Sequence, residues 1–179
     1  MRGLRRDLAR KAPDAGERAA RMAPEALIGR YPIVAGYRAV GAELDPTPLM
    51  RHLAEAGAQL ALPVTLAPDA ALIFRAYSLG DPLVADALGM PAPPPEAAEV
   101  EPDLFLTPVV AFDQTGGRMG QGGGFYDRTL AALRARRAIF ALGIAYAGQE
   151  VARLPLEAHD QRLDAILTES AYIEAQKEF

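Results

Sequence analysis

The chain has 179 residues, the size of one ordinary domain; half of them are apolar and 23% are charged. It can therefore bury a sizeable core and is not intrinsically disordered. The absence of cysteine excludes disulfides, thiolate nucleophiles and cysteine-ligated metals, and two histidines are too few for a typical multi-histidine metal centre. No apolar run approaches the roughly 20 residues that cross a bilayer, and no signal-peptide pattern follows the first basic residues. We expect a cytoplasmic protein that needs no membrane.

The net charge of −4 is unevenly distributed along the chain. The basic N-terminal arm, residues 1–21, carries seven Arg or Lys against three Asp or Glu, which leaves −8 for the remainder. A net acidic protein is a poor general binder of nucleic acid. We therefore expect no nucleic-acid partner, and the basic arm needs another explanation.

Short β-prone runs alternate with helical patterns along the chain. The first predicted strand covers residues 33–38, after which Asp45 as N-cap and Pro46 in the first turn open a helix that Gly57 closes. The next elements are listed in chain order: strands 59–64, 72–77 and 104–107 (an extension to 111 is left open), a glycine-dense turn 116–124, a helix from 128 to about 136, and strands 138–146 and 165–168.

This alternation predicts an α/β fold: one domain over residues 1–179, with a mostly parallel sheet flanked by helices on both faces. In such sheets, ligands bind in the crevice outside the carboxyl ends of the strands. We therefore expect the functional site next to the segment that follows residues 104–111.

The glycine-rich loop, residues 116–124, holds six glycines in nine positions. Glycines let a ligand approach the backbone, and successive free N–H groups bind anions, an effect that the start of the following helix strengthens. Arg118 adds a permanent positive charge and Asp127 an oxygen ligand for magnesium. The spacing matches neither common nucleotide-binding glycine motif, so the pattern predicts only a phosphate-bearing ligand. A plain hairpin turn, with Asp127 acting only as a helix cap, stays open as the alternative.

Residues 103–130 read D-L-F-L-T-P-V-V-A-F-D-Q-T-G-G-R-M-G-Q-G-G-G-F-Y-D-R-T-L. They closely resemble the C-terminal motif of the 5-formyltetrahydrofolate cyclo-ligases, also called methenyltetrahydrofolate synthetases. Other segments resemble the same family in the expected order: Glu43-Leu44-Asp45, Gly80-Asp81-Pro82-Leu83, Ala145-Tyr146, Gln149-Glu150, Leu154-Pro155 and His159-Asp160. The resemblance covers nearly the whole chain.

The resemblance implies an α/β enzyme that uses ATP as co-substrate and Mg²⁺ as cofactor. Such an enzyme converts 5-formyltetrahydrofolate to 5,10-methenyltetrahydrofolate, with release of ADP and phosphate. The formyl oxygen would first be phosphorylated, and the 10-nitrogen would then close the ring as phosphate departs. The implied partners are thus small molecules, a reduced folate and ATP, and we expect a monomer or weak homodimer.

The family's functional residues map onto this chain as follows. The ATP-binding positions are Arg2, Leu4, Arg5, Arg118, Met119, Gly120, Gln121, Gly122, Gly123, Gly124, Phe125 and Tyr126. The substrate-binding positions are Arg38, Glu43, Gln121, Gly122, Gly123, Gly124 and Phe125. Arg118 and Asp127 are the expected catalytic residues, and Asp127 and Asp160 the expected metal ligands.

Two positions depart from the family pattern. Met1 occupies the place of a lysine expected to hold ATP phosphates, and Ala92 stands where many relatives carry a polar side chain. These changes leave open a non-catalytic homologue that binds ATP and folate. A second alternative is an isomerase or transferase on a similar sheet, which would bind a sugar phosphate or coenzyme A at the glycine-rich loop.

Overall fold

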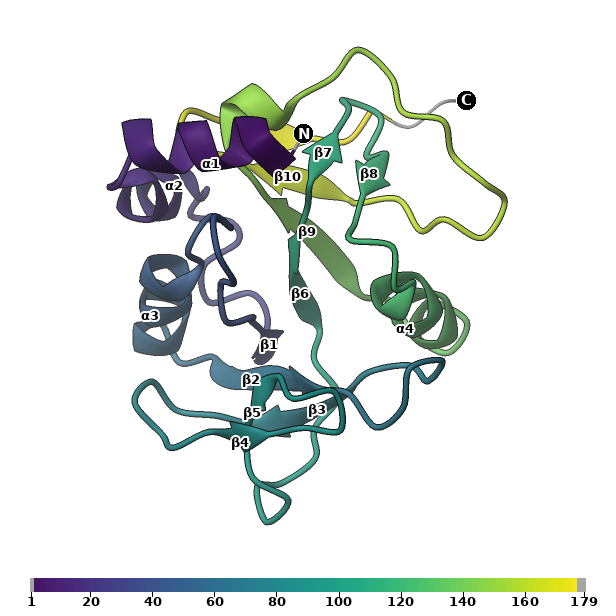
Figure 1. Cartoon of the computed structure of the whole chain (residues 1–179). Coiled ribbons are helices and arrows are strands. Elements are labelled where there is room, and N and C mark those ends of the chain that lie inside the picture. Colours follow the sequence, from purple (N-terminus) through teal and green to yellow (C-terminus); the bar gives the residue numbers. More distant parts are fainter. Residues whose placement is uncertain (1, 177–179) are drawn as a thin grey trace.

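The computed structural model describes residues 2–176, with Arg2 as backbone only, and is built around a seven-stranded sheet in the order β11-β10-β9-β6-β1-β2-β3 (Figure 1). The strands are β1 Ile33–Ala35, β2 Gln59–Val64, β3 Ile73–Ala76, β6 Leu104–Pro108, β9 Phe140–Ile144, β10 Ala165–Leu167 and β11 Tyr172–Glu174. The five inner strands are parallel, and the two edge strands, β3 and β11, are antiparallel to their neighbours. The predicted mostly parallel sheet is confirmed.

Helices cover both faces of the sheet, as predicted (Figure 1). On one face lie α2 (Ala15–Met22) and α3 (Thr47–Glu55), with α1 (Arg2–Lys11) beside them and packed against the short 3-10 helix η1 (Ala147–Gln149). On the other face lies α4 (Phe125–Arg134). None of the helices in the described part of the chain is long and apolar enough to cross a membrane.

The alternation of side chains along each strand sorts the apolar residues into two cores. In β6, Leu104 and Leu106 pack with the residues of α2 and α3, whereas Phe105 between them packs with Leu130 and Leu133 of α4. All three β6 side chains are fully buried. This central strand is covered on both faces, which explains the apolar run over residues 104–106.

The predicted boundaries of β1 and α4 differ most from the observed ones. The strand expected over residues 33–38 ends at Ala35, and the chain then leaves the sheet as a loop that leads to α3. The helix expected from residue 128 begins at Phe125, because Gly124 (φ +64°) turns the chain directly before it. The predicted N-cap of α3 is also one residue off: Pro46 holds that position because its backbone is already helical, and Asp45 lies just before it. Oδ1 of Asp45 still accepts the backbone N–H of Thr47 at 3.0 Å.

The connections around β1 and β6 run in opposite directions. From β1 the chain passes through α3 to β2 on one side, whereas from β6 it passes through α4 to β9 on the other. The loops that leave the carboxyl ends of these two adjacent strands therefore diverge and leave a crevice between them. Two small hairpins border this end of the sheet: β4 (Val84–Ala85) with β5 (Pro91–Ala92), and β7 (Ala111–Phe112) with β8 (Arg118–Met119).

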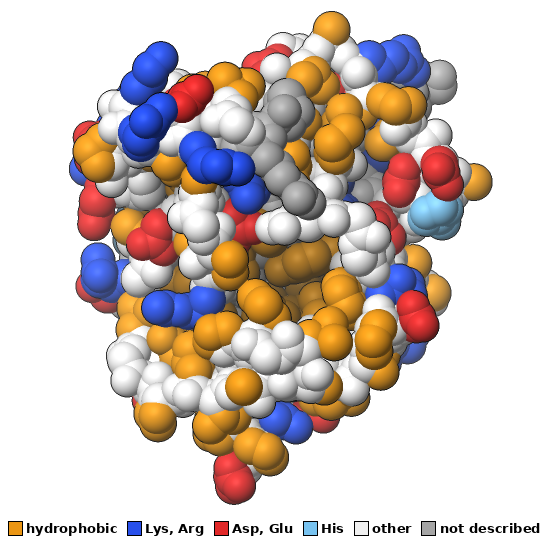
Figure 2. Space-filling view, viewed as in Figure 1, with side chains coloured by type: hydrophobic (Ala, Val, Ile, Leu, Met, Phe, Trp, Pro, Cys, Tyr) orange, Lys and Arg blue, Asp and Glu red, His pale blue; other side chains and the backbone are white. Residues whose placement is uncertain are grey.

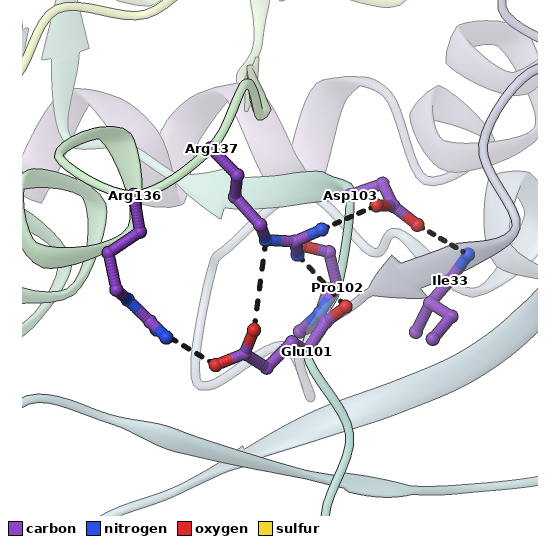
Figure 3. Close-up of polar contacts among 6 residues, drawn as sticks. All are labelled: Ile33, Glu101, Pro102, Asp103, Arg136 and Arg137. Atoms are coloured by element: carbon purple, nitrogen blue, oxygen red, sulfur yellow. Dashed lines mark hydrogen bonds and ion pairs between the residues drawn. The ribbon is translucent and has the colours of Figure 1, made fainter.

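The opposite, amino ends of β1 and β6 are held by the guanidinium of Arg137 (Figure 3). Its Nη1 donates to Oδ1 of Asp103 at 2.7 Å, and its Nη2 donates to the carbonyls of Glu101 and Pro102. The second carboxylate oxygen of Asp103 accepts the backbone N–H of Ile33 at 3.2 Å. This network, which we call the Arg137 clasp, fixes the two central strands to the segment that follows α4.

Candidate active site

A cavity of about 750 Å³ opens at the carboxyl ends of β1, β2 and β6. Tyr37, Thr65 and Val109, which follow these strands, lie in its wall together with the loop that precedes α4. Figure 2 shows it as a hollow in the molecular surface with hydrophobic side chains inside. The cavity therefore lies where the fold class predicts that a ligand would bind.

The predicted glycine-rich loop is divided into two parts. Gly116 (φ +81°) and Gly117 form the turn between β7 and β8, so the plain hairpin alternative holds for them. Residues 118–124 border the cavity, and within this part Gly122 and Gly124 have left-handed backbones, with φ of +96° and +64°. Only the second part is placed to contact a ligand in the cavity.

Arg118 and Asp127, the two expected catalytic residues, form an ion pair in the cavity wall, with 2.5 Å between Nη2 and Oδ1. Only 6% of the Arg118 side chain is exposed, and its Nε makes no hydrogen bond to any residue in the range 2–176. The same oxygen of Asp127 accepts the backbone N–H of Gln161 at 3.0 Å. The charged pair is therefore held in one place before any ligand arrives.

The two expected metal ligands, Asp127 and Asp160, line the same cavity. Asp160 is oriented by the N–H of Glu157, which donates to its Oδ2 at 2.8 Å. His159 also borders the cavity, but its side chain is 72% exposed. Across the described part of the chain, no three His, Asp or Glu side chains converge on one point where they could hold a metal ion.

Glu43, an expected substrate-binding residue, contacts both Arg5 and Gln121. Its Oε1 accepts the Gln121 side-chain amide at 2.8 Å and lies 3.8 Å from Nη1 of Arg5, while Oε2 accepts the N–H of Val40. Arg5 is buried, and its Nε and Nη1 make no hydrogen bond within the part of the chain that is described. Three segments that are distant in the sequence thus meet at one carboxylate.

Tyr37, which is buried, and Tyr126, which is partly buried, complete the polar wall. Burial, followed by the nearby charge of Glu43, raises the pKa of Tyr37 and that of Tyr126 well above the usual value. The hydroxyl of Tyr37 donates to the carbonyl of Leu44 at 2.5 Å and so supports the loop that carries Glu43. Both side chains are therefore neutral hydrogen-bonding groups at physiological pH.

Most of the predicted site residues are brought together in this cavity. Its wall contains Arg5, Arg38, Glu43, Arg118, Met119, Gly120, Gln121, Gly122, Gly123, Gly124, Phe125, Tyr126, Asp127 and Asp160. Leu4 is exposed and does not border it, and Met1 and the side chain of Arg2 lie outside what is described. Ala92 is buried in the β4–β5 hairpin and does not line the cavity.

Leu88 and Met90 were not among the predicted site residues, yet they form one side of the cavity from the loop between β4 and β5. Asp86 holds this loop: its Oδ1 accepts the N–H groups of both residues, and its Oδ2 accepts that of Thr65 after β2, all at 2.9 Å. A single aspartate between two strands of two residues each carries no recognisable periodicity, so no local signal identifies it.

Comparison with known proteins identifies the family. A profile described as the 5-formyltetrahydrofolate cyclo-ligase family matches residues 2–169. The chain belongs to this cyclo-ligase family. Among named relatives, the 5-formyltetrahydrofolate cyclo-ligase of Escherichia coli K12 is 39% identical over 143 residues, which is 76% of this chain and 78% of that protein. The cyclo-ligase of Mycolicibacterium smegmatis is 37% identical over 144 residues, 75% of this chain and 72% of that protein.

Solved structures of cyclo-ligases share the fold. The 5,10-methenyltetrahydrofolate synthetase of Aquifex aeolicus has a TM-score of 0.72 and 28% identity, and the match covers 100% of this chain and 87% of that one. The enzyme of the same name from Mycoplasma pneumoniae has a TM-score of 0.68, with 94% and 98% covered, and at 21% identity it bears on the fold alone. The resemblance inferred from the sequence, the α/β fold and the assignment to an enzyme family are confirmed.

Proposed function

We propose that this protein converts 5-formyltetrahydrofolate to 5,10-methenyltetrahydrofolate at the expense of ATP, which leaves as ADP and phosphate. The observation that carries the proposal is a pair of buried arginines, Arg5 and Arg118, in the wall of one cavity. Three of their guanidinium nitrogens lack a hydrogen-bond acceptor among the described residues. Buried polar groups are normally paired, so these donors call for an anionic ligand, and a triphosphate supplies the acceptors.

The loop before α4 supports the same assignment. Gly122 has open space where a side chain would lie, so a ligand can approach the backbone there. The N-terminal end of α4 starts at Phe125 beside this loop and adds a partial positive charge. In the proposal, residues 120–124 and Arg118 hold the triphosphate, with Arg5 at its other side.

The acidic side chains suit Mg²⁺ bound together with a nucleotide. Mg²⁺ binds oxygen ligands, and it typically takes one or two carboxylates and completes its octahedron with phosphate oxygens and water. Asp127 and Asp160 offer two carboxylates in one cavity. A bound Mg²⁺ would neutralise charge on the phosphate oxygens.

Glu43 and Gln121 are the proposed contacts of the reduced folate. They line the same cavity as the apolar Leu88 and Met90, which offer a surface for the flat rings of such a ligand. The Glu43 carboxylate can accept N–H donors of a heterocycle, and Tyr37 beneath it keeps its loop in place. This face would orient the formyl group toward the phosphates.

The proposed reaction has two steps. The formyl oxygen attacks the γ-phosphorus, the bond from that phosphorus to the bridging oxygen breaks, and ADP takes the electron pair. The 10-nitrogen then attacks the formyl carbon, the carbon–oxygen bond breaks with release of phosphate, and the nitrogen loses its proton. Arg118 would stabilise the charge of the transferring group.

The test is a direct assay. The protein is incubated with 5-formyltetrahydrofolate, ATP and Mg²⁺, and the near-ultraviolet absorbance of the methenyl product is followed together with phosphate release. We expect product and phosphate in equal amounts, and neither when ATP is omitted. Absence of product at high enzyme concentration would contradict the proposal; nucleotide binding without turnover would then indicate a non-catalytic homologue.

A further inference from the structure

Asp113 lies outside the cavity, yet it connects two segments that contribute charged side chains to the cavity wall, one with Arg118 and the other with Asp160. We propose that Asp113 is a positioning residue that sets the placement of Arg118 relative to Asp160 and thereby the site for the magnesium–nucleotide complex. The inference deepens the proposed function and rests on it. Each of the two oxygens of this carboxylate accepts hydrogen bonds from a different one of the two segments.

Oδ1 shapes the turn that leads into β8. It accepts the backbone N–H of Thr115 at 2.9 Å, the Thr115 hydroxyl at 2.7 Å and the backbone N–H of Gly117 at 3.0 Å. Arg118 directly follows Gly117. The direction in which the Arg118 side chain leaves the hairpin therefore depends on this oxygen.

Oδ2 holds the second segment, because it accepts the backbone N–H of Leu154 at 2.8 Å. Leu154 begins the stretch 154–160, which borders the cavity at both of its ends and finishes at Asp160. The next residue, Gln161, donates its N–H to Asp127, which is itself paired with Arg118. Asp113 thus closes a ring of contacts around the charged end of the cavity.

The environment of Asp113 suits a fixed acceptor. The residue is only 1% exposed. Burial by itself would raise the pKa of this carboxyl, but hydrogen bonds from Thr115, Leu154 and Gly117 outweigh burial and lower it. A side chain at Gly117 would bring its Cβ within 2.6 Å of Oδ2, so glycine is required for the carboxylate to occupy this position.

The experiment compares Asp113→Asn with Asp103→Asn. Asp103 is a suitable control because it also binds a backbone N–H and joins separate segments, but at the opposite end of the sheet. Thermal unfolding, steady-state turnover and the binding of a non-hydrolysable ATP analogue, with Mg²⁺ and with EDTA, are measured for both variants and the wild type. Loss of a residue that orients metal ligands typically costs about 10- to 100-fold in metal affinity or activity.

We expect both variants to unfold at lower temperature, while only Asp113→Asn loses the Mg²⁺-dependent part of analogue binding, by about 10-fold or more. If Asp113→Asn does not fold, Gly117→Ala is tested in its place. The added Cβ would displace Oδ2 of Asp113, and the charge of the carboxylate would stay unchanged. Wild-type Mg²⁺ dependence in the folded variant, equal losses in both variants, or no analogue binding by the wild type would overturn the inference. A wild type that binds the analogue but makes no methenyl product overturns the proposed function alone.

Discussion

The side-chain amide of Gln121 donates a 2.8 Å hydrogen bond to the carboxylate of Glu43, 78 positions earlier in the sequence. This bond joins the loop before α4 to the loop between β1 and α3. Nη1 of Arg5 in α1 lies 3.8 Å from the same carboxylate oxygen. Glu43 therefore contacts both Arg5, which we propose binds the triphosphate, and Gln121, which we propose binds the folate. We therefore expect the binding of ATP to affect the side chains that bind the folate, and the binding of the folate to affect those that bind ATP.

Replacement of Glu43 by alanine should lower kcat/KM for 5-formyltetrahydrofolate by about 10- to 100-fold, because a hydrogen bond to a charged group contributes about 1.5–3 kcal/mol. It also leaves the buried Arg5 without its carboxylate partner. Steady-state kinetics with folate varied at saturating ATP would measure the effect. Glu55→Ala, at the exposed end of α3, serves as the control and should behave as wild type. An unchanged kcat/KM would exclude Glu43 from substrate binding.

Asp127→Ala should reduce turnover by at least about 100-fold, because it removes a proposed metal ligand and leaves the buried Arg118 side chain unpaired. We expect the variant to stay folded. The rate would be measured with ATP and Mg²⁺ at saturating concentrations, and circular dichroism would establish the fold. His52→Ala, on an exposed position of α3, should be nearly silent. Asp127→Ala with the wild-type rate would exclude this carboxylate from the reaction.

Arg137→Ala should destabilise the protein by about 1–3 kcal/mol without changing kcat or KM. The clasp that it breaks holds the amino ends of β1 and β6, away from the cavity (Figure 3). Denaturant titration gives the free energy of unfolding. Arg51→Ala removes only an exposed ion pair, in which Nη1 of Arg51 lies 3.9 Å from Oε1 of Glu17. This control should leave the free energy of unfolding nearly unchanged. Equal stability of the two variants would show that the clasp contributes little.

Acid should loosen the loop between β4 and β5 through Asp86. Burial would raise the pKa of this carboxyl, but hydrogen bonds from Thr65, Met90 and Leu88 outweigh it and lower the pKa. A carboxyl whose pKa is lower in the folded state contributes its stability above the unfolded value of about 3.9 and loses it as the pH falls through the folded value. Asp86→Asn should therefore be less stable than wild type at pH 7, and the difference should shrink below about pH 4. Chemical denaturation at several pH values measures this difference, and a constant difference would contradict the role of the charge.

Much of the architecture could be predicted because it depends on local patterns. The strand predicted over residues 59–64 is β2, residue for residue, since its apolar run and the following turn are sequence-local signals. The start of α4 was predicted three residues too late because Phe125 and Tyr126 are weak helix formers, and a left-handed glycine together with packing over the sheet decides that boundary. The short β4–β5 hairpin could not be predicted, because its pairing depends on Asp86 and the end of β2.

The sequence by itself determined which chemical groups the site contains: the backbone N–H groups of a glycine-rich loop, a permanent cation at Arg118 and a carboxylate at Asp127, all within one short segment. Only the tertiary structure decided that Glu43 meets Arg5 and Gln121, and that Asp160 lines the same cavity as Asp127. These contacts join segments tens of residues apart. The sheet order that brings the segments together results from burying two apolar faces at once, and no local pattern encodes that outcome.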